Sequence, residues 1–293
     1  MTERPAATDR WRVASVIQSH PVIGFFTLAL ALTWSAWIPL FLIVPSPTSV
    51  VMMPGAFGPA LAAALVLWLR GASVRDWLVA GLEWQIGSKW YLVALGLPVG
   101  LALSLGAGLV VVTGQLRLAR LAQAVTMYPV LILLTTVLGG GQEEFGWRGF
   151  ALPALQSRFD ALTASIVIGI VWAAWHLPAF VFEIPGYTGS FAVYALLVVG
   201  ISIILTWLYN NTGGSILLAM LTHGGVNAAP SIGATLGGEL PTSSVSPYVL
   251  LGAAVWIVAL ALLFRYGPET LSAGPAVSTI AQDTAERTTE VSV

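Results

Sequence analysis

The chain has no cysteine, and only 9% of its 293 residues are charged. Without cysteine it can form no disulfide, no thiol nucleophile, no thiolate metal site and no prenylated C-terminus of its own. Its formal net charge is −1 and its lysines and arginines do not cluster, so it presents no basic surface for nucleic acid. These shortages exclude cysteine proteases, disulfide-stabilised domains and nucleic-acid-binding proteins.

Apolar residues are abundant instead. They make up 57% of the sequence, and the mean hydropathy is +0.86. A soluble domain does not carry so many apolar residues, so we predict an all-α, polytopic bundle of about eight transmembrane helices. The predicted spans are residues 21–44, 53–69, 91–112, 127–147, 161–182, 191–209, 214–229 and 248–264.

Polar segments flank this predicted membrane domain, which covers residues 21–266. Residues 1–20 precede an apolar segment that is too long for the core of a cleaved signal peptide, so we expect a cytoplasmic N-terminal segment and a retained first span. Residues 267–293 are rich in Ser, Thr, Ala and Pro, and we predict that they form a disordered, solvated tail.

The basic residues set the predicted orientation. With a cytoplasmic N-terminus and eight spans, ten of the twelve basic residues lie on the cytoplasmic side, the exceptions being Arg117 and Arg120. We therefore expect both termini in the cytoplasm, and the fourth span to end at the cytoplasmic face, where an intramembrane polar cavity would open. Between the second and third spans, residues 76–84 are predicted to form an amphipathic surface helix.

Two adjacent carboxylates and an arginine stand near the end of the fourth predicted span. Charged groups at membrane depth are rare and usually functional, because hydrocarbon does not solvate them. On a helix Arg148 lies four residues after Glu144 and can pair with it, whereas Glu143 points about 100° away and stays free. The alternative is an ion pair among the lipid headgroups that only ends a helix.

Two of the three histidines lie within predicted spans. His176 is in the fifth and His223 in the seventh, whereas His20 precedes the first span and is expected to be interfacial. Either histidine alone could be a core residue that hydrogen-bonds between helices. Asn227 follows His223 by four residues, so both side chains lie on one helical face and can contact the same group.

Carboxylates and imidazoles in one site favour hydrolysis. A carboxylate with imidazoles can take a proton from water, orient the nucleophile and stabilise an oxyanion. Two histidines and a carboxylate can also bind zinc and leave a fourth position for water. The residue types alone leave both mechanisms open.

Three spaced motifs carry a resemblance to a known family. Over residues 125–230 the chain resembles the CPBP intramembrane protease family, which includes CaaX prenyl endopeptidases and bacterial proteins linked to bacteriocin processing and immunity. In chain order the motifs are Glu143-Glu144-x-x-x-Arg148, Trp172-x-x-x-His176 and His223-x-x-x-Asn227. The family usually has phenylalanine where this chain has Trp172, a change that we interpret as conservative for packing.

The resemblance implies a role for each of these residues. Glu143 with His176 would activate water, His223 and Asn227 would hold the oxyanion, and Glu144 with Arg148 would be a supporting pair. In the family's metalloprotease description, a divalent metal such as zinc would instead contact Glu143, His176 and His223.

The resulting hypothesis is an intramembrane endopeptidase of a bacterial cell membrane, with the lipid bilayer and a membrane-associated peptide or protein as its partners. The alternatives are a non-catalytic bacteriocin-immunity or scaffold protein and an ion-coupled transporter, because buried Glu and His also occur in ion pathways. Pro178 is expected to kink or loosen the fifth span, which could help to open a cavity. The glycines around the motifs are expected to serve close helix packing: Gly140, Gly141, Gly146, Gly224 and Gly225.

Overall fold

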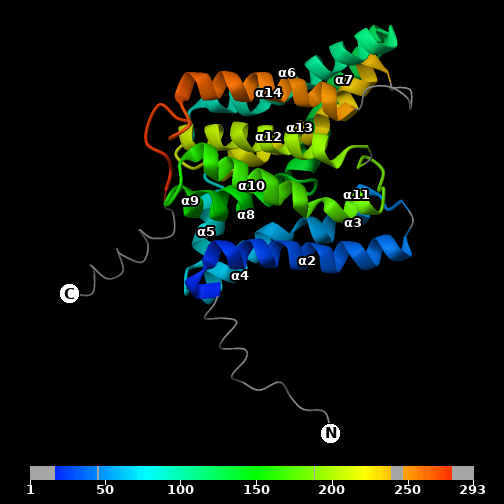
Figure 1. Cartoon of the computed structure of the whole chain (residues 1–293). Coiled ribbons are helices and arrows are strands. Elements are labelled where there is room, and N and C mark those ends of the chain that lie inside the picture. Colours follow the sequence, from blue (N-terminus) through cyan, green and yellow to red (C-terminus); the bar gives the residue numbers. More distant parts are fainter. Residues whose placement is uncertain (1–16, 45, 188, 239–246, 279–293) are drawn as a thin grey trace, which may run out of the picture.

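The computed structural model describes residues 17–44, 46–187, 189–238 and 247–278. Every regular element in this part of the chain is helical, so the predicted all-α class is confirmed (Figure 1). The longer helices are α2 (Pro21–Ile43), α3 (Ser49–Ala56), α4 (Gly58–Leu69), α5 (Val74–Gly81), α6 (Ser88–Thr113), α7 (Leu121–Val137), α10 (Ala161–Trp175), α12 (Phe191–Asn211), α13 (Ile216–Gly237) and α14 (Pro247–Tyr266).

Short helical turns connect several of these helices. They are η1 (Leu118–Arg120), η2 (Gly141–Glu143), α8 (Glu144–Gly146), the π-helical η3 (Trp147–Ala151), α9 (Leu152–Gln156) and α11 (Leu177–Val181). Four longer helices begin at a side chain that accepts a hydrogen bond from the backbone N–H three residues later, as is typical of N-caps. These caps are Ser73, Asp160, Ser190 and Ser215.

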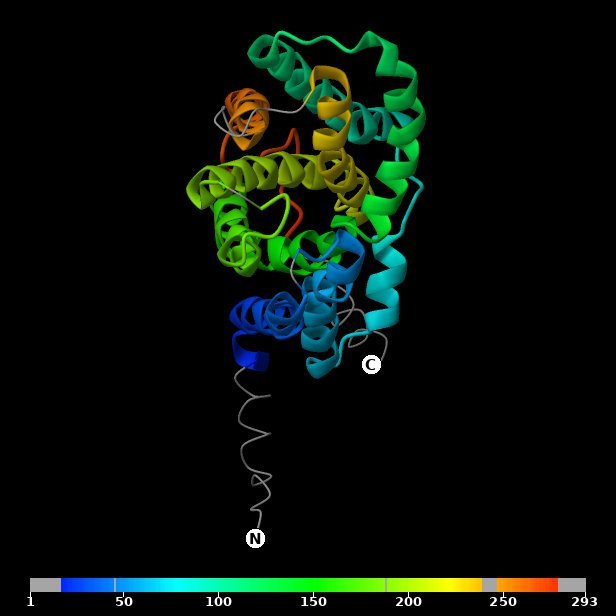
Figure 2. The same ribbon diagram turned by 90° about the vertical axis from the view of Figure 1, so that its right-hand side faces the viewer.

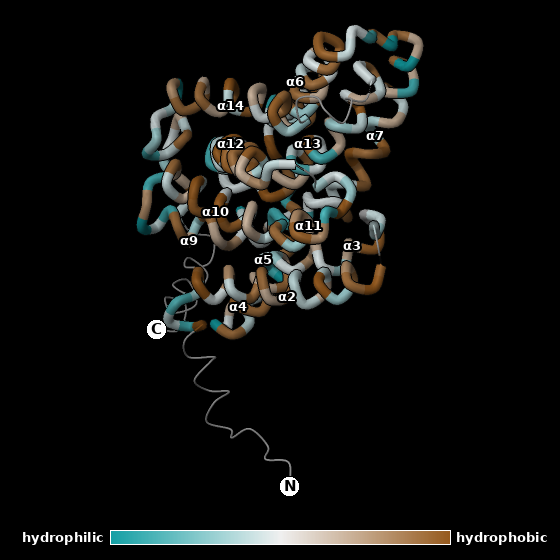
Figure 3. Tube along the Cα trace, turned by 45° about the vertical axis from the view of Figure 1, so that its right-hand side comes forward, coloured by the Kyte–Doolittle hydropathy of each residue, from teal (hydrophilic) through white to brown (hydrophobic). Residues whose placement is uncertain are grey.

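The helices are arranged in layers. In Figure 1, α2, α3 and α4 form the lower layer, α10 and α12 lie above them, and α6, α7 and α14 are uppermost. Helix α13 packs mainly against α6 and α7, and α10 packs against α12. The same grouping is visible after a quarter turn in Figure 2. Hydrophobic residues follow the long helices and hydrophilic ones gather in the connections (Figure 3), as expected for an integral membrane protein.

Within the described residues, six segments are long and apolar enough to cross a membrane. They are Pro21–Ile43, Val50–Leu69, Ser88–Thr113, Leu118–Gln156, Phe191–Asn211 and Pro247–Tyr266. The predicted spans 161–182 and 214–229 correspond to α10 with α11 and to α13, which are not among the six. The polytopic bundle is therefore confirmed, whereas the number of eight spans stays a prediction.

The fourth predicted span, 127–147, is wrong as a single helix. Helix α7 ends at Val137, and the chain turns through three glycines before the short helices that carry the glutamates. Gly140 has a φ of +127°, which side-chain-bearing residues rarely adopt. The glycine triplet thus ends the helix and turns the next segment into the protein.

The fifth predicted span breaks just before Pro178, the residue expected to kink or loosen it. Helix α10 ends at Trp175, His176 is the residue at the break, and Pro178 lies in the first turn of α11. Proline is tolerated there because the first helical N–H groups have no intrahelical partner. The break places His176 at the end of a helix.

The expected disordered tail does not include the residues directly after residue 267. Leu271 is fully buried, and the carbonyls of Glu269 and Thr270 accept hydrogen bonds from Ala161 N and Asn210 Nδ2. Residues 267–278 are therefore part of the packed structure. The remaining predicted tail, 279–293, and the first sixteen residues of the predicted N-terminal segment lie outside the described residues.

Candidate active site

The motif glutamates and arginine lie inside the bundle. Glu143 ends η2, Glu144 begins α8, and Arg148 lies in the π-helical turn η3. Glu144 and Arg148 are fully buried and Glu143 nearly so, which rules out the headgroup ion pair that the sequence left open. π-Helical turns are rare in proteins, and those that occur are often found at functional sites.

The predicted pair of Glu144 and Arg148 is confirmed. Arg148 Nη1 lies 3.1 Å from Glu144 Oε2, and Nη2 donates to the hydroxyl of Ser202 at 2.9 Å. The Ser202 hydroxyl in turn donates to the carbonyl of Ser165 at 2.8 Å. The guanidinium carbon is 5.4 Å from the centre of the Trp172 ring, within cation–π distance. A buried arginine needs this set of partners, because an unpaired charge there would be strongly destabilising.

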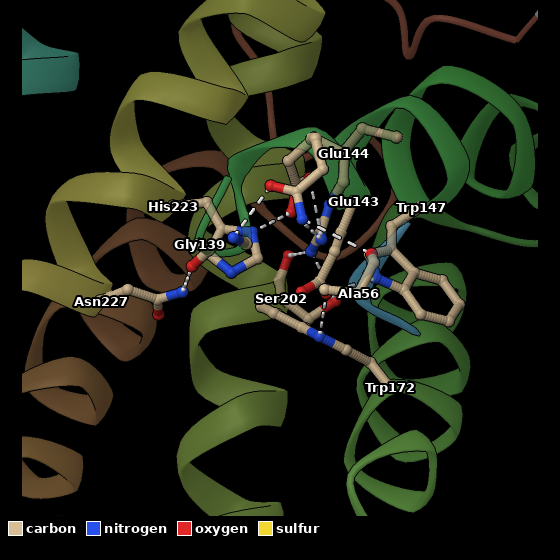
Figure 4. Close-up of polar contacts among 12 residues, drawn as sticks. Ala56, Gly139, Glu143, Glu144, Trp147, Trp172, Ser202, His223 and Asn227 are labelled. Carbon is tan, nitrogen blue, oxygen red and sulfur yellow. Dashed lines mark hydrogen bonds and ion pairs between the residues drawn. The ribbon is translucent and has the colours of Figure 1, made fainter. Parts of the chain in front are cut away.

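Glu144 also holds His223, which the sequence did not predict. His223 Nδ1 lies 2.7 Å from Glu144 Oε1 (Figure 4). An ionised carboxylate only accepts hydrogen bonds, so Nδ1 carries the proton in this contact and Nε2 is left to face elsewhere. Glu144 is thus shared between an arginine on its own segment and a histidine 79 residues away.

His223 and Asn227 meet at the glycine turn, so the predicted common face is confirmed. A methyl group on Gly140 would lie 2.8 Å from His223 Nε2 and would overlap the Asn227 amide. Asn227 Nδ2 donates to the carbonyl of Gly139 at 2.7 Å. Gly140 is therefore required at the site itself, whereas Gly146, Gly224 and Gly225 serve helix packing against residues of neighbouring helices.

Glu143 has no ion pair, as predicted, but two indole groups hold it. Its Oε2 accepts hydrogen bonds from Trp172 Nε1 at 2.9 Å and from Trp147 Nε1 at 3.2 Å. Phenylalanine could not donate the first of these bonds. The interpretation of Trp172 as a conservative packing change is therefore incomplete.

His176 lies beyond Trp172 and is enclosed by aromatic rings. Its Nδ1 is 3.0 Å from the carbonyl of Trp172, and its ring stacks on Tyr187 with centroids 5.5 Å apart. Burial, and then the negative charge of Glu143, raise the pKa of Tyr187 in the connection before α12. Among the described residues no hydrogen bond joins His176 directly to Glu143, so Trp172 is the residue that links them.

The predicted metal ligands do not form a metal site in this arrangement. Over the described ranges, no three His, Asp or Glu side chains are grouped so that they could hold a metal ion. Nδ1 of His223 contacts Glu144 and Nδ1 of His176 contacts a backbone carbonyl, which leaves Nε2 as the free nitrogen of each ring. As these side chains lie in the described part of the chain, Glu143, His176 and His223 are not grouped to hold one metal ion, and the chemical steps below use only the protein's own residues.

Comparison with known proteins places this site in a family. Residues 125–229 match the family model described as "Type II CAAX prenyl endopeptidase Rce1-like". This segment is an Rce1-like domain. It contains every motif residue from Glu143 to Asn227, so the resemblance to the CPBP family is confirmed, and the domain is related to membrane endopeptidases.

A curated relative matches about a third of the chain. "CAAX prenyl protease 2" of Methanococcus maripaludis is 37% identical over 102 residues, which are 32% of this chain and 37% of the relative. The match thus spans little more than a third of the relative's length. It supports the relationship of the domain and leaves the activity of the whole protein as a proposal.

Sequence reasoning missed several residues of the site. Trp147 follows Glu143 at the same four-residue spacing as Arg148 follows Glu144, so its contact had a detectable signal. Gly140 and Ser202 had none, because a glycine or a serine in an apolar segment is ordinarily a packing residue.

Proposed function

We propose that this protein is an intramembrane endopeptidase that hydrolyses a peptide bond with water activated by Glu143. The observation that carries the proposal lies inside an apolar bundle: Trp172 donates to the carboxylate of Glu143 and packs against His223, which meets Asn227 at the glycine turn. Structural ion pairs alone would not need His223 Nε2 and Asn227 to meet at one glycine.

Glu143 would act as the general base. Two indole donors occupy its Oε2, and no described group donates to Oε1, so Oε1 is the oxygen that can take a proton from water. The resulting hydroxide adds to the scissile carbonyl. Glu143 then returns the proton to the leaving amine as the C–N bond breaks, which completes hydrolysis without a cofactor.

His223 and Asn227 would stabilise the oxyanion. Donation from Nε2 to the oxyanion would use the imidazolium form of His223, whose other N–H, at Nδ1, is held by the carboxylate of Glu144. The Asn227 amide donates to Gly139 at rest and would turn to donate to the oxyanion. Arg148 would hold Glu144 in place through their ion pair, and His176 would assist in placing the water or the substrate beside Glu143.

The substrate class follows from the membrane setting and the relative. A site within the bundle can receive a peptide held at the membrane, and the relative's name refers to prenylated CAAX proteins. We therefore propose a membrane-associated substrate and a prenylated C-a-a-X peptide as the first probe. The bacterial cell membrane, the cytoplasmic termini and a cavity that opens to the cytoplasm belong to the same proposal.

The test uses the purified full chain in liposomes with a farnesylated C-a-a-X peptide and the same peptide without farnesyl. Mass spectrometry should detect release of the last three residues by the wild type and none by Glu143→Gln. The exposed Glu83→Gln is the matched control and should cut at the wild-type rate. Equal cleavage by Glu143→Gln would refute the proposal.

Two further measurements separate the alternative hypotheses. From the arrangement of the side chains we expect that metal analysis of the purified wild type finds less than one metal ion per chain, and that cleavage survives a chelator. One zinc per chain that is lost in His223→Ala would contradict the metal-free mechanism. If neither peptide is cut while the liposomes carry protons or metal ions, the transporter hypothesis replaces the protease.

A further inference from the structure

Trp172 contacts four of the polar residues of the candidate site. Its indole N–H donates to Glu143, and its carbonyl oxygen lies 3.0 Å from His176 Nδ1. Its ring packs edge-on against His223 with centroids 4.8 Å apart, and Arg148 lies over its face. The side chain is only 3% exposed, so these contacts are made away from lipid and water.

The two indole donors act on a single oxygen. The terminal torsion of a glutamate is broad, so an unrestrained carboxylate can rotate and exchange its two oxygens. With Trp147 and Trp172 both bound to Oε2, the carboxylate plane is fixed and Oε1 is presented alone. The donors come from two segments, 4 and 29 residues away from Glu143, which holds the carboxylate from two sides.

We propose that Trp172 is a positioning residue that fixes the Glu143 carboxylate through its indole N–H, with Trp147 as the weaker second donor. The inference rests on the proposed function, because the oxygen that Trp172 leaves free is the one assigned to the attacking water. It also gives the tryptophan at this position a role that a phenylalanine cannot fill.

The substitution Trp172→Phe isolates this hydrogen bond. Phenylalanine keeps an aromatic ring against His223 and Arg148 and keeps the backbone carbonyl for His176, but has no N–H to donate. Trp77→Phe is the matched control, because Trp77 is also buried and its indole donates to a backbone carbonyl, that of Gly149. Both variants should fold and lose one buried indole hydrogen bond.

Turnover of the farnesylated peptide separates positioning from a structural role. We expect Trp172→Phe to lower kcat about tenfold or more with KM within about twofold, because the bond orients the base and does not hold the substrate. Trp147→Phe should have a smaller effect, in line with its longer bond, and Trp77→Phe should keep the wild-type kcat. Equal kcat in Trp172→Phe and Trp77→Phe would overturn the proposal, as would a rise in KM alone.

An infrared measurement distinguishes failure of this proposal from failure of the proposed function. The difference spectrum between the wild type and Glu143→Gln isolates the carboxyl bands of Glu143, and the same difference is then taken in the Trp172→Phe and Trp77→Phe backgrounds. The bands should shift only with Trp172→Phe. Unshifted bands would overturn the proposal whatever the activity. Shifted bands in a protein that cuts no peptide would refute the proposed protease function, while the positioning of Glu143 by Trp172 would stand.

Discussion

His176 and His223 are both buried histidines of the same bundle, yet their surroundings differ in kind. His223 lies within the continuous helix α13, with its Nδ1 on the carboxylate of Glu144, which a buried Arg148 also contacts. His176 lies at the break between α10 and α11, with its Nδ1 on a backbone carbonyl and its ring against Tyr187.

This difference assigns different work to the two rings. A carboxylate partner can stabilise the positive charge of an imidazolium, so His223 is suited to donate a hydrogen bond to an oxyanion. A carbonyl and an aromatic shell offer no compensating charge, so His176 is suited to act as a neutral group that orients water or substrate. Under the proposed function, we therefore expect the two histidines to have distinct roles that their partners determine.

The largest effect should come from removing either ring. His176→Ala and His223→Ala should each lower turnover about 10²- to 10⁴-fold, because the first removes the group proposed to place water or substrate and the second removes the proposed oxyanion donor. Product release is measured by mass spectrometry with His20→Ala, an exposed histidine, as the control. Near-normal turnover in one of the two variants would show that this ring belongs only to the packing.

The next change tests the carboxylate of Glu144, which contacts His223 but not His176. Glu144→Gln leaves Arg148 buried without a counter-ion, so we expect the free energy of unfolding to fall by about 3–5 kcal/mol. Denaturation in detergent measures it, with the exposed Glu83→Gln expected to change it by less than about 0.5 kcal/mol. Unaltered stability of Glu144→Gln would mean that His223 is not held by a buried charge network.

Gly140→Ala should impair the His223 side of the site without touching His176. The added methyl group would displace Asn227 and His223 Nε2, and a displacement of about 1 Å at reacting groups can lower turnover about a hundredfold. Gly96→Ala in α6 is the control, since a methyl group there meets open space. If turnover of Gly140→Ala matched that of Gly96→Ala, His223 and Asn227 would not need their present positions.

The smallest effect should appear on the His176 side. Tyr187→Ala removes the stacked ring, which contributes about 0.5–1.5 kcal/mol in aromatic pairs, so turnover should fall about two- to tenfold. Tyr187→Phe keeps the ring and should stay close to the wild type. Turnover is measured for both variants by mass spectrometry. A loss of similar size in Tyr187→Phe and Tyr187→Ala would contradict the role of the stacked ring and assign the effect to the hydroxyl group.

Much of the fold followed from local patterns. Apolar segments of membrane-spanning length predicted the helices well, and α2 begins at Pro21 as predicted. The four-residue rule placed Arg148 on Glu144 even though the turn that joins them is partly π-helical, because the residues between them keep nearly helical geometry. The breaks in the helices were harder to predict. Pro178 indicated a distortion of the fifth span, whereas the glycines near the glutamates were interpreted as helix-packing residues.

The sequence by itself determined the helical membrane class, the family and the polar pairs spaced four residues apart, because each depends on composition or on contacts within one helical turn. Only the tertiary structure decided that Glu144 is shared with His223, 79 residues away, and that Trp172 donates to Glu143 across 29 residues. Such contacts depend on how helices from distant parts of the chain pack, and helical periodicity carries no information about the partner that a buried polar group meets.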